Sequence, residues 1–412
     1  MLITLLLATR CFAVDATEEL IKKNFAHLEA YYQDLHEHPE LSMKETRTAG
    51  KVAEEFRRLG LETFELGGGV VGVLKNGKGP VTLVRSELDA LPVEENTGLA
   101  YKSQNPGVMH ACGHDLHTTA LVGTAAAMLE QKALWRGTLV FVAQPGEEVV
   151  KGAKAMLDAG LLKKIPKLDY AVALHTRGDV PTGMIGFAAG PMMASADSVD
   201  VTIRGKGAHG ARPDKGIDPI VIAAEFVIKM QTLVGREINP IQPALITVGS
   251  IHGGTKHNII PEEVKLQITV RTYDGDVRNL LIKRIEEIAK GLSKTANAPE
   301  PSFAVIESTP PTSSDPAFMA RFRDSVIKAI GKDKVTQTEA TMGAEDFGLF
   351  AKAANVPNLF FWVGADDAKD KTIGNHSPKF APRYKIVLPL AIRAMTAGLL
   401  EVQGSDTRVG ER

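Results

Sequence analysis

The stretch Leu139-Val-Phe-Val-Ala143 is followed directly by Gln144-Pro-Gly-Glu-Glu148. Five apolar residues in succession are typical of a strand that is buried on both faces, as in an α/β protein. A second such run, Tyr170-Ala-Val-Ala-Leu174, ends at His175. Ligands of an α/β sheet bind at the carboxyl ends of its strands. We therefore expect an α/β fold with the glutamate pair and His175 at one edge of the sheet.

Helical patterns alternate with short β-rich runs before this point, which supports the α/β class. We expect helices over 17–38 and 45–59, strands over 70–74 and 81–85, and an alanine-rich helix that continues through residue 129.

The pattern of apolar and polar residues changes after residue 190. The segment 198–204 alternates with period two, as a half-exposed strand does. Helices are expected over 217–234 and 276–297, and strands over 244–251, 264–272 and 303–306. This β-α-β-β-α-β order is that of a ferredoxin-like unit. Because site-like residues resume at 342–347, we predict an inserted lid domain.

The length of 412 residues also favours two domains over one core. We expect a leader at 1–16, a catalytic domain formed by 17–190 and 307–412, and the lid at 191–306. The net charge of −1 without a basic run argues against nucleic acid or an acidic membrane as partner. Apolar runs stay short of the roughly 20 residues of a membrane span, so we expect a soluble protein.

The first 13 residues contain a short apolar run that ends in a small residue, as in a secretory signal. We predict export, to the periplasm or outside the cell. A cytoplasmic location is the alternative, because no Lys or Arg precedes the run and Arg10 interrupts it. Removal of the leader would leave Cys112 as the one cysteine, which excludes a disulfide within the chain.

The heptapeptide Met109-His-Ala-Cys-Gly-His-Asp115 carries a thiol between two imidazoles. Cys112 and His114 are two residues apart, so on an extended turn both can face one metal ion. Two other interpretations stay open for Cys112, a nucleophile activated by histidine and a buried inert thiol.

Adjacent carboxylates follow the apolar strand at Glu147 and Glu148. One can bind metal while the other moves a proton, although a solvated loop is the ordinary reading of such a pair. His175 and His376 are candidate ligands, whereas a lone histidine is more often structural. His209 lies in a glycine-rich turn that matches no phosphate-binding motif well.

Eight motifs follow one another along the chain. They are Glu87-Leu-Asp-Ala-Leu-Pro92, Asn105-Pro-Gly-Val-Met-His-Ala-Cys-Gly-His-Asp115, Gln144-Pro-Gly-Glu-Glu148, Ala173-Leu-His175, Gly205-Lys-Gly-Ala-His209, His257-Asn-Ile-Ile-Pro261, Gly343-Ala-Glu-Asp-Phe347 and Asn375-His-Ser-Pro378. In this order they resemble the M20 metallopeptidase family, in the amidohydrolase branch with hippurate hydrolases and indole-acetyl-amino-acid hydrolases.

The resemblance covers roughly residues 18–400 and implies a centre with two divalent ions, Zn²⁺ or Mn²⁺. It implies five metal ligands, which are Cys112, His114, Glu148, His175 and His376. Glu147 would be the general base and acid, and Asp89 would orient a ligand. It also implies lid residues that bind substrate, His209, Asn258 and, more weakly, Arg271. Lids of this family commonly dimerise, so a homodimer or tetramer is expected.

One departure concerns Glu87 in Arg85-Ser-Glu-Leu-Asp89, where the family usually has aspartate. The additional methylene lies near the expected ions, so metal identity or pocket shape can differ.

We thus expect hydrolysis of an N-acyl amino acid, a small-molecule substrate, to a carboxylic acid and a free amino acid. The alternatives are a metallo-dipeptidase or carboxypeptidase with the same centre, acyl transfer through Cys112, and a non-catalytic binding protein. A binding protein is expected to lack a base such as Glu147.

Overall fold

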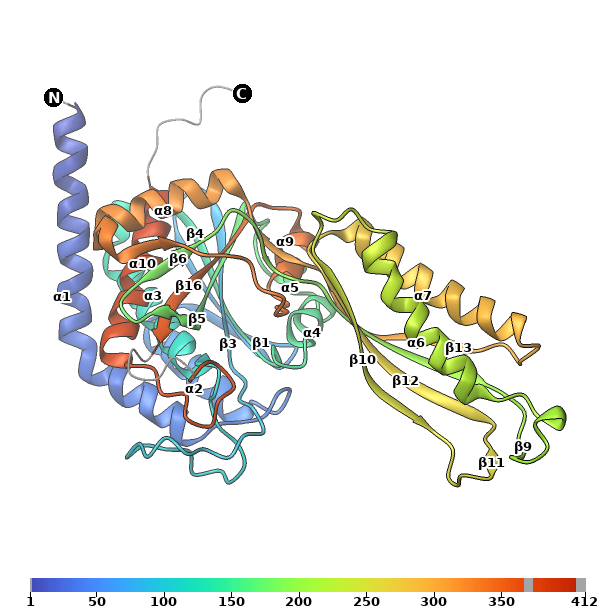
Figure 1. The fold of residues 1–412 in the computed structure, drawn as a ribbon. Helices are drawn as coiled ribbons and strands as arrows, with labels where there is room; N and C mark the ends of the chain where they lie inside the picture. The colour runs from blue at the N-terminus through green and yellow to red at the C-terminus, as the bar shows by residue number, and fades with distance from the viewer. Residues whose placement is uncertain (1, 367–372, 405–412) are drawn as a thin grey trace. The chain divides into compact units, whose positions relative to one another are not determined.

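The computed structural model describes residues 2–366 and 373–404, and the chain divides into two compact units. The first unit comprises Met1–Met192, Ser313–Glu339 and Asp346–Arg412. The second, which we call the inserted unit, comprises Met193–Thr312 and Ala340–Glu345. Figure 1 shows the chain coloured along its length.

The first unit is built on a mixed sheet of eight strands in the order β1-β2-β4-β3-β5-β16-β6-β15. The strands are β1 (Glu62–Leu66), β2 (Gly69–Asn76), β3 (Val81–Glu87), β4 (Gly137–Gln144), β5 (Tyr170–Pro181), β6 (Ile185–Phe187), β15 (Val335–Gln337) and β16 (Asn358–Asp366). Strand β3 pairs in parallel with both β4 and β5, and β5 pairs in parallel with β16. The carboxyl ends of these central strands therefore lie along one edge of the sheet.

Strand β4 confirms the interpretation of the apolar run 139–143. All eight of its residues are buried, because it lies inside the sheet between β2 and β3 and is covered on both faces. The glutamate pair follows its last residue, Gln144, after two intervening residues, Pro145 and Gly146.

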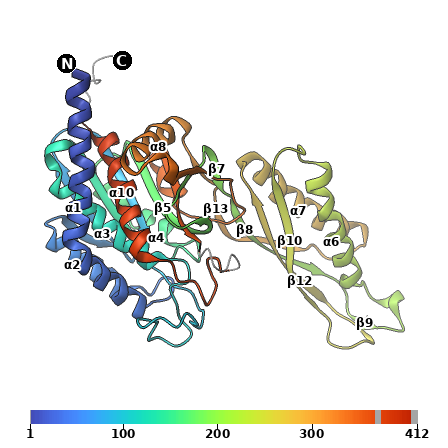
Figure 2. The same ribbon diagram turned by 60° about the vertical axis from the view of Figure 1, so that its left-hand side comes forward.

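Helices pack around this sheet, and Figure 2 shows α1, α3 and α10 side by side. The helices are α1 (Leu2–Glu37), α2 (Thr46–Arg58), α3 (His114–Glu130), α4 (Gly152–Asp158), α5 (Leu161–Lys164), α8 (Pro316–Ile330), α9 (Gly348–Ala354) and α10 (Tyr384–Gln403). Helix α10 contacts α1, α3 and α8. Among the described residues, α10 alone is long and apolar enough to cross a membrane by composition, with a mean hydropathy of 1.4, which we did not expect. Burial of 67% of that window explains the composition, because a central core helix needs apolar side chains on most sides.

The inserted unit has a four-stranded antiparallel sheet in the order β10-β12-β8-β13. Its elements are β8 (Ala196–Arg204), β9 (Ala208–His209), α6 (Pro219–Arg236), β10 (Ala244–Gly253), β11 (Ile259–Ile260), β12 (Glu263–Thr272), α7 (Gly275–Thr295) and β13 (Ser302–Thr309). Helices α6 and α7 bury their apolar sides against the sheet. The four long strands and two helices follow the predicted β-α-β-β-α-β order.

The segment Ala340–Glu345 belongs to the inserted unit, whereas we expected it in the second part of the catalytic domain. Backbone contacts explain the difference. The N–H of Ala194 donates to the carbonyl of Gly343 at 2.9 Å, and Met193 forms a parallel bridge with Thr341. Two short strands, β7 (Gly190–Met193) and β14 (Thr312–Ser314), pair where the chain passes between units.

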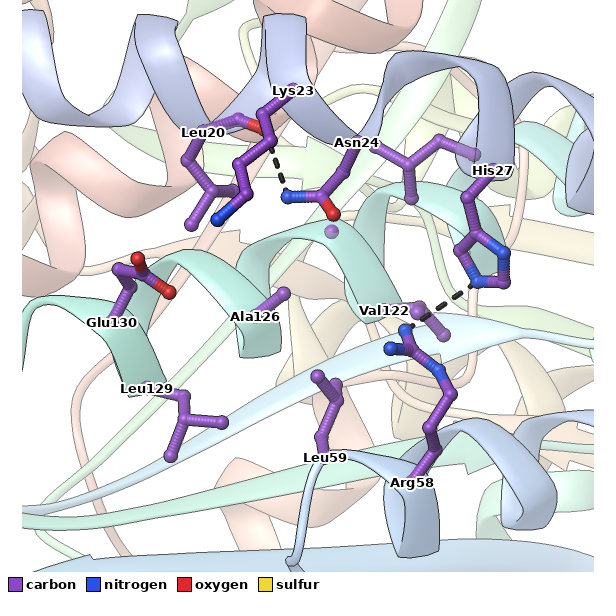
Figure 3. A pocket seen from close by; sticks show the side chains of 12 residues that line it. Leu20, Lys23, Asn24, His27, Arg58, Leu59, Val122, Ala126, Leu129 and Glu130 are labelled. Carbon is purple, nitrogen blue, oxygen red and sulfur yellow. Dashed lines mark hydrogen bonds between the residues drawn. The ribbon is translucent and has the colours of Figure 1, made fainter.

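A pocket of about 150 Å³ lies between α1, α2 and α3 in the first unit. Figure 3 shows its apolar floor with Lys23, His27, Arg58 and Glu130 at the rim. None of the residues predicted to hold a metal lines this pocket.

Candidate metal centre

The predicted ligands meet at the carboxyl edge of the central strands of the first unit. Cys112, His114 and His175 offer atoms that all lie within 4.8 Å of one another, and Cys112, Glu148 and His376 form a second such group. The expectation that the strand ends at His175 is wrong. Strand β5 continues to Pro181, because it keeps pairing with β16 beyond that point.

Gly113 allows Cys112 and His114 to face the same space. It precedes α3 with a φ of 88°, a left-handed conformation that glycine adopts without steric cost. A Cβ at this position would lie 2.5 Å from Oγ1 of Thr176. The spacing of the two ligands therefore depends on a residue without a side chain between them.

The thiol of Cys112 faces two imidazoles. Its Sγ lies 3.6 Å from Nε2 of His175 and 3.4 Å from Nε2 of His376. His376 has a φ of 69°, and its N–H donates to the carbonyl of Ala111 at 2.7 Å. This backbone bond holds the turn that carries His376 beside the cysteine motif.

The two glutamates approach the same group of side chains. Oε1 of Glu148 lies 3.4 Å from Nε2 of His376 and 4.0 Å from Nε2 of His114. Oε2 of Glu147 lies 3.7 Å from Nε2 of His114. The two separations from His114 exceed a hydrogen bond and leave room for a cation between the imidazole and the carboxylates.

Hydrogen bonds fix the tautomers of two histidines. Nδ1 of His175 lies 2.7 Å from the carbonyl of Thr176, and Nδ1 of His114 lies 2.8 Å from the carbonyl of Asp89. A carbonyl oxygen only accepts, so each Nδ1 carries a proton. Each Nε2 is therefore directed to the centre, as in a metal-binding histidine oriented by a second partner.

The charges of the centre favour a cation. Burial lowers the pKa of His114, but its hydrogen bond to Asp89 and the nearby carboxylates outweigh this and raise the pKa to about 10. Burial and the charges of Glu148 and Glu147 raise the pKa of Cys112 well above that of a free thiol. A reactive cysteine needs the opposite shift. The surroundings thus disfavour a nucleophilic Cys112 and suit a thiolate that is stabilised by a metal ion.

The residues present fit a metal. Nε2 of His114 is buried and has no hydrogen-bond partner among the described residues, which is costly unless another group satisfies it. Imidazole, thiolate and carboxylate are together the donors that borderline divalent ions bind.

The side chain of Asp89 connects two candidate ligands, His114 and Glu148. Its Oδ2 accepts from Oγ of Ser42 at 2.7 Å and from the N–H of Glu148 at 2.9 Å, while its Oδ1 lies 3.2 Å from Nδ1 of His114. Burial raises the pKa of Asp89, but the bond to His114 and the other donors lower it below its usual range. It therefore stays ionised and holds both His114 and the Glu148 loop.

Asn375, the first residue of the motif Asn375-His-Ser-Pro378, also supports the centre. Its Nδ2 lies 3.6 Å from Sγ of Cys112 and donates to the carbonyls of Cys112 and Thr176, each at 3.2 Å. Its position directly before His376 was a usable signal. Ser42, by contrast, has no motif around it that could have indicated its bond to Asp89.

The other predicted site residues lie in the inserted unit. His209 pairs with Ile259 between β9 and β11, and the N–H of Gly210 donates to the carbonyl of Asn258 at 2.8 Å, so His209 and Asn258 are neighbours. Arg271 lies near the far end of β12, where its Nη1 is 3.4 Å from the carbonyl of Met342. Within this unit Arg271 is thus separate from the other two, and the roles of all three stay predictions.

Comparisons with known proteins show the family of the chain. The family model of Peptidase family M20/M25/M40 matches residues 83–398. The chain is 34% identical to an N-acetylcysteine deacetylase of Bacillus subtilis, over 84% of this chain and 90% of that protein. It is 36% identical to thermostable carboxypeptidase 1 of Saccharolobus solfataricus, over 90% and 94% respectively. It is 32% identical to an IAA-amino acid hydrolase of Arabidopsis thaliana, over 84% and 78%.

Solved structures show the same fold. A dinuclear metal-binding peptidase of Bacillus subtilis superposes with a TM-score of 0.79 at 29% identity, over 93% of this chain and 99% of that one. A Staphylococcus aureus protein described as an aminohydrolase superposes with a TM-score of 0.88, also at 29% identity, over 94% and 99%.

Buried histidines, a thiol and paired carboxylates at the edge of an α/β sheet define a metal-dependent hydrolase of amide bonds. The chain belongs to Peptidase family M20/M25/M40.

Proposed function

We propose that this protein is an amidohydrolase that cleaves N-acyl amino acids to a carboxylic acid and a free amino acid. The observation that carries the proposal is the position of Glu147, whose Oε2 lies 3.7 Å from Nε2 of His114 beside the five candidate ligands. The N-acetylcysteine deacetylase and the IAA-amino acid hydrolase among its relatives support an N-acyl amino acid as substrate.

In this proposal two divalent ions, zinc or manganese, would be held by five side chains. The five side chains are Cys112, His114, Glu148, His175 and His376. The two overlapping groups of donors, with Cys112 in both, support a pair of ions, as does the dinuclear peptidase of the same fold. When bound, such ions polarise the amide carbonyl and lower the pKa of a water molecule toward neutrality.

The chain's own residues move the proton. Glu147 accepts it from the attacking water and later delivers it to the departing amine, so one carboxylate acts as base and then as acid. Asp89 keeps Nε2 of His114 directed at the centre throughout. His209 and Asn258 bind the substrate carbonyl or carboxylate, and Arg271 is a further candidate for the carboxylate.

The same centre suits a carboxypeptidase or dipeptidase, and the 36% identity to a thermostable carboxypeptidase favours this as the second candidate. A paired assay separates them, with N-acetyl-, N-benzoyl- and long-chain N-acyl amino acids against dipeptides and N-blocked dipeptides. We expect a higher kcat/KM for the simple N-acyl amino acids, and activity that a chelator abolishes. Faster cleavage of peptides would overturn the substrate assignment, and activity indifferent to chelators would overturn the metal assignment.

Self-association through the inserted unit is part of the proposal. Strand β10 is an edge of its sheet, and an unpaired edge can accept a strand from a second copy. Ile228 and Ile251 are 71% and 52% exposed on this unit, which gives it apolar contact surface. Sedimentation analysis of Ile251→Lys against wild type tests this. We expect the wild type to be a dimer or tetramer and the variant to dissociate, and a monomeric wild type would contradict it.

We also propose that residues 1–16 are a leader that is removed on export, with a cytoplasmic protein as the alternative. Helix α1 extends from Leu2 and includes this segment. Sequencing of the mature N-terminus from cell fractions tests the proposal, because export predicts a start close to Thr17 in the periplasmic or secreted fraction.

A further inference from the structure

Glu87 is buried behind the candidate metal centre and bridges two basic side chains. Nη1 of Arg85 donates to its Oε1, and Nδ1 of His117 lies 2.8 Å from its Oε2. Both carboxylate oxygens are thus occupied, and the side chains of Arg85 and Glu87 are fully buried. Arg85, Glu87 and His117 are thus linked in this order by hydrogen bonds, and we call the three residues the Arg85–Glu87–His117 series.

His117 connects this series to Thr176 through its second ring nitrogen. The N–H of Thr176 donates to Nε2 of His117 at 2.8 Å, and a backbone N–H only donates, so the proton of His117 is on Nδ1. This is the tautomer that a carboxylate at Nδ1 selects. The His117 ring also lies 4.5 Å from the ring of His175, between centroids.

Thr176 in turn contacts two candidate ligands. Its carbonyl accepts from Nδ1 of His175 at 2.7 Å, and its Oγ1 donates to the carbonyl of Cys112 at 2.8 Å. One residue therefore connects the imidazole and the thiol whose reactive atoms are 3.6 Å apart.

Glu87, His114 and His117 could by proximity form a metal site of their own. Their hydrogen bonds argue against it, because Glu87 is paired with Arg85, and Nε2 of His117 already accepts from Thr176. The group is better explained as support for the ligands.

We propose that Arg85, Glu87 and His117 are positioning residues that act through Thr176 to set the separation and orientation of Cys112 and His175. The inference deepens the proposed function and rests on its metal centre. It assigns Glu87 to a bridge from the buried Arg85 to His117.

Replacement of Glu87 by glutamine shows why the carboxylate is needed. If the amide oxygen faces His117, the amide NH₂ faces the guanidinium of Arg85, and two donors meet without an acceptor. If the amide is reversed, NH₂ faces the Nδ1–H of His117. His117 then changes tautomer and loses the N–H of Thr176. Neither orientation keeps the series intact.

Cobalt(II) substitution tests the proposal, because a thiolate ligand gives a charge-transfer band and the d–d bands report geometry. The variants are Glu87→Gln and Thr176→Val, and the second removes the hydroxyl that bonds to the carbonyl of Cys112 and lies 3.0 Å from Nε2 of His117, while it keeps the backbone groups of Thr176. We expect both to bind cobalt about 10- to 100-fold more weakly than wild type, with shifted bands and a lower kcat at similar KM.

A control is available in a second Arg–Glu–His series in the same unit. Glu55 lies 2.7 Å from Nη2 of Arg58 and 3.1 Å from Nε2 of His27, away from the candidate ligands. Glu55→Gln removes the same charge and is expected to lower Tm while it leaves the cobalt affinity and spectrum unchanged.

The outcomes separate this inference from the proposed function. Wild-type cobalt affinity and spectrum in both Glu87→Gln and Thr176→Val, with at most the loss of Tm seen in Glu55→Gln, would overturn the positioning role. A wild-type protein that binds no cobalt would instead overturn the metal centre itself. If Glu87→Gln does not fold, the result with Thr176→Val decides.

Discussion

The N–H of Glu148 donates a hydrogen bond to Oδ2 of Asp89 at 2.9 Å. The carbonyl of Asp89 also accepts from Nδ1 of His114 at 2.8 Å. The turn after β4 and the first residue of α3 are therefore tied to one carboxylate residue that follows β3. The distance between these two candidate ligands is set by Asp89.

Asp89→Asn is expected to weaken metal binding by about 10- to 100-fold. If the single amide oxygen accepts from Ser42 and from the N–H of Glu148, the amide NH₂ faces Nδ1–H of His114, and two donors meet without an acceptor. Competition with a chromogenic chelator measures the affinity. Asp197→Asn is the matched control, because Asp197 is a buried aspartate paired with Arg278 in the inserted unit. An affinity equal in the two variants would contradict the role of Asp89.

The sequence predicted the parts of the fold that follow from local pattern. The apolar run 139–143 indicated a buried strand, and the spacing of Cys112 and His114 indicated a shared target. It did not predict that β5 continues past His175, because that depends on pairing with β16, a strand almost 190 residues later in the chain. The bonds of Asn375 to Cys112 and of His117 to Thr176 are likewise tertiary contacts that no local periodicity encodes.

Cys112 is expected to act as a metal ligand and not as a nucleophile. Its thiol is buried, and a bound metal ion would occupy the thiolate, so the metal-loaded enzyme should resist an alkylating agent. A chelator should abolish activity, and added zinc or manganese should restore it. Rapid inactivation of the loaded enzyme by iodoacetamide, together with indifference to the chelator, would support acyl transfer through the thiol.

His36 is expected to make stability depend on pH in the alkaline range. Burial lowers its pKa, but hydrogen bonds to Asp115 and Glu95 outweigh this and raise it from 6.5 to about 9. Because the pKa of His36 is higher in the folded protein than in the unfolded chain, protonated His36 stabilises the fold. This stabilisation is fully present below about pH 6.5 and is lost as the pH rises through about 9. It is on the order of 3 kcal/mol.

Urea titrations of wild type and His36→Gln between pH 6 and pH 10 measure this contribution. The difference in the free energy of unfolding should shrink with rising pH, with most of the change between pH 6.5 and 9. A difference that is constant over this range would show that His36 does not gain a proton-dependent stabilisation from Asp115 and Glu95.

The most direct test of the account compares Glu147→Gln with Glu148→Gln, with metal content and the hydrolysis of an N-acetyl amino acid measured on the same samples. Glu147→Gln should keep the metal content of wild type and lose about 10²- to 10⁴-fold in kcat, because it removes the proton carrier and leaves the ligands. Glu148→Gln should lose metal together with activity. Near-wild-type turnover in Glu147→Gln, at full metal content, would contradict the assignment of Glu147 as the general base.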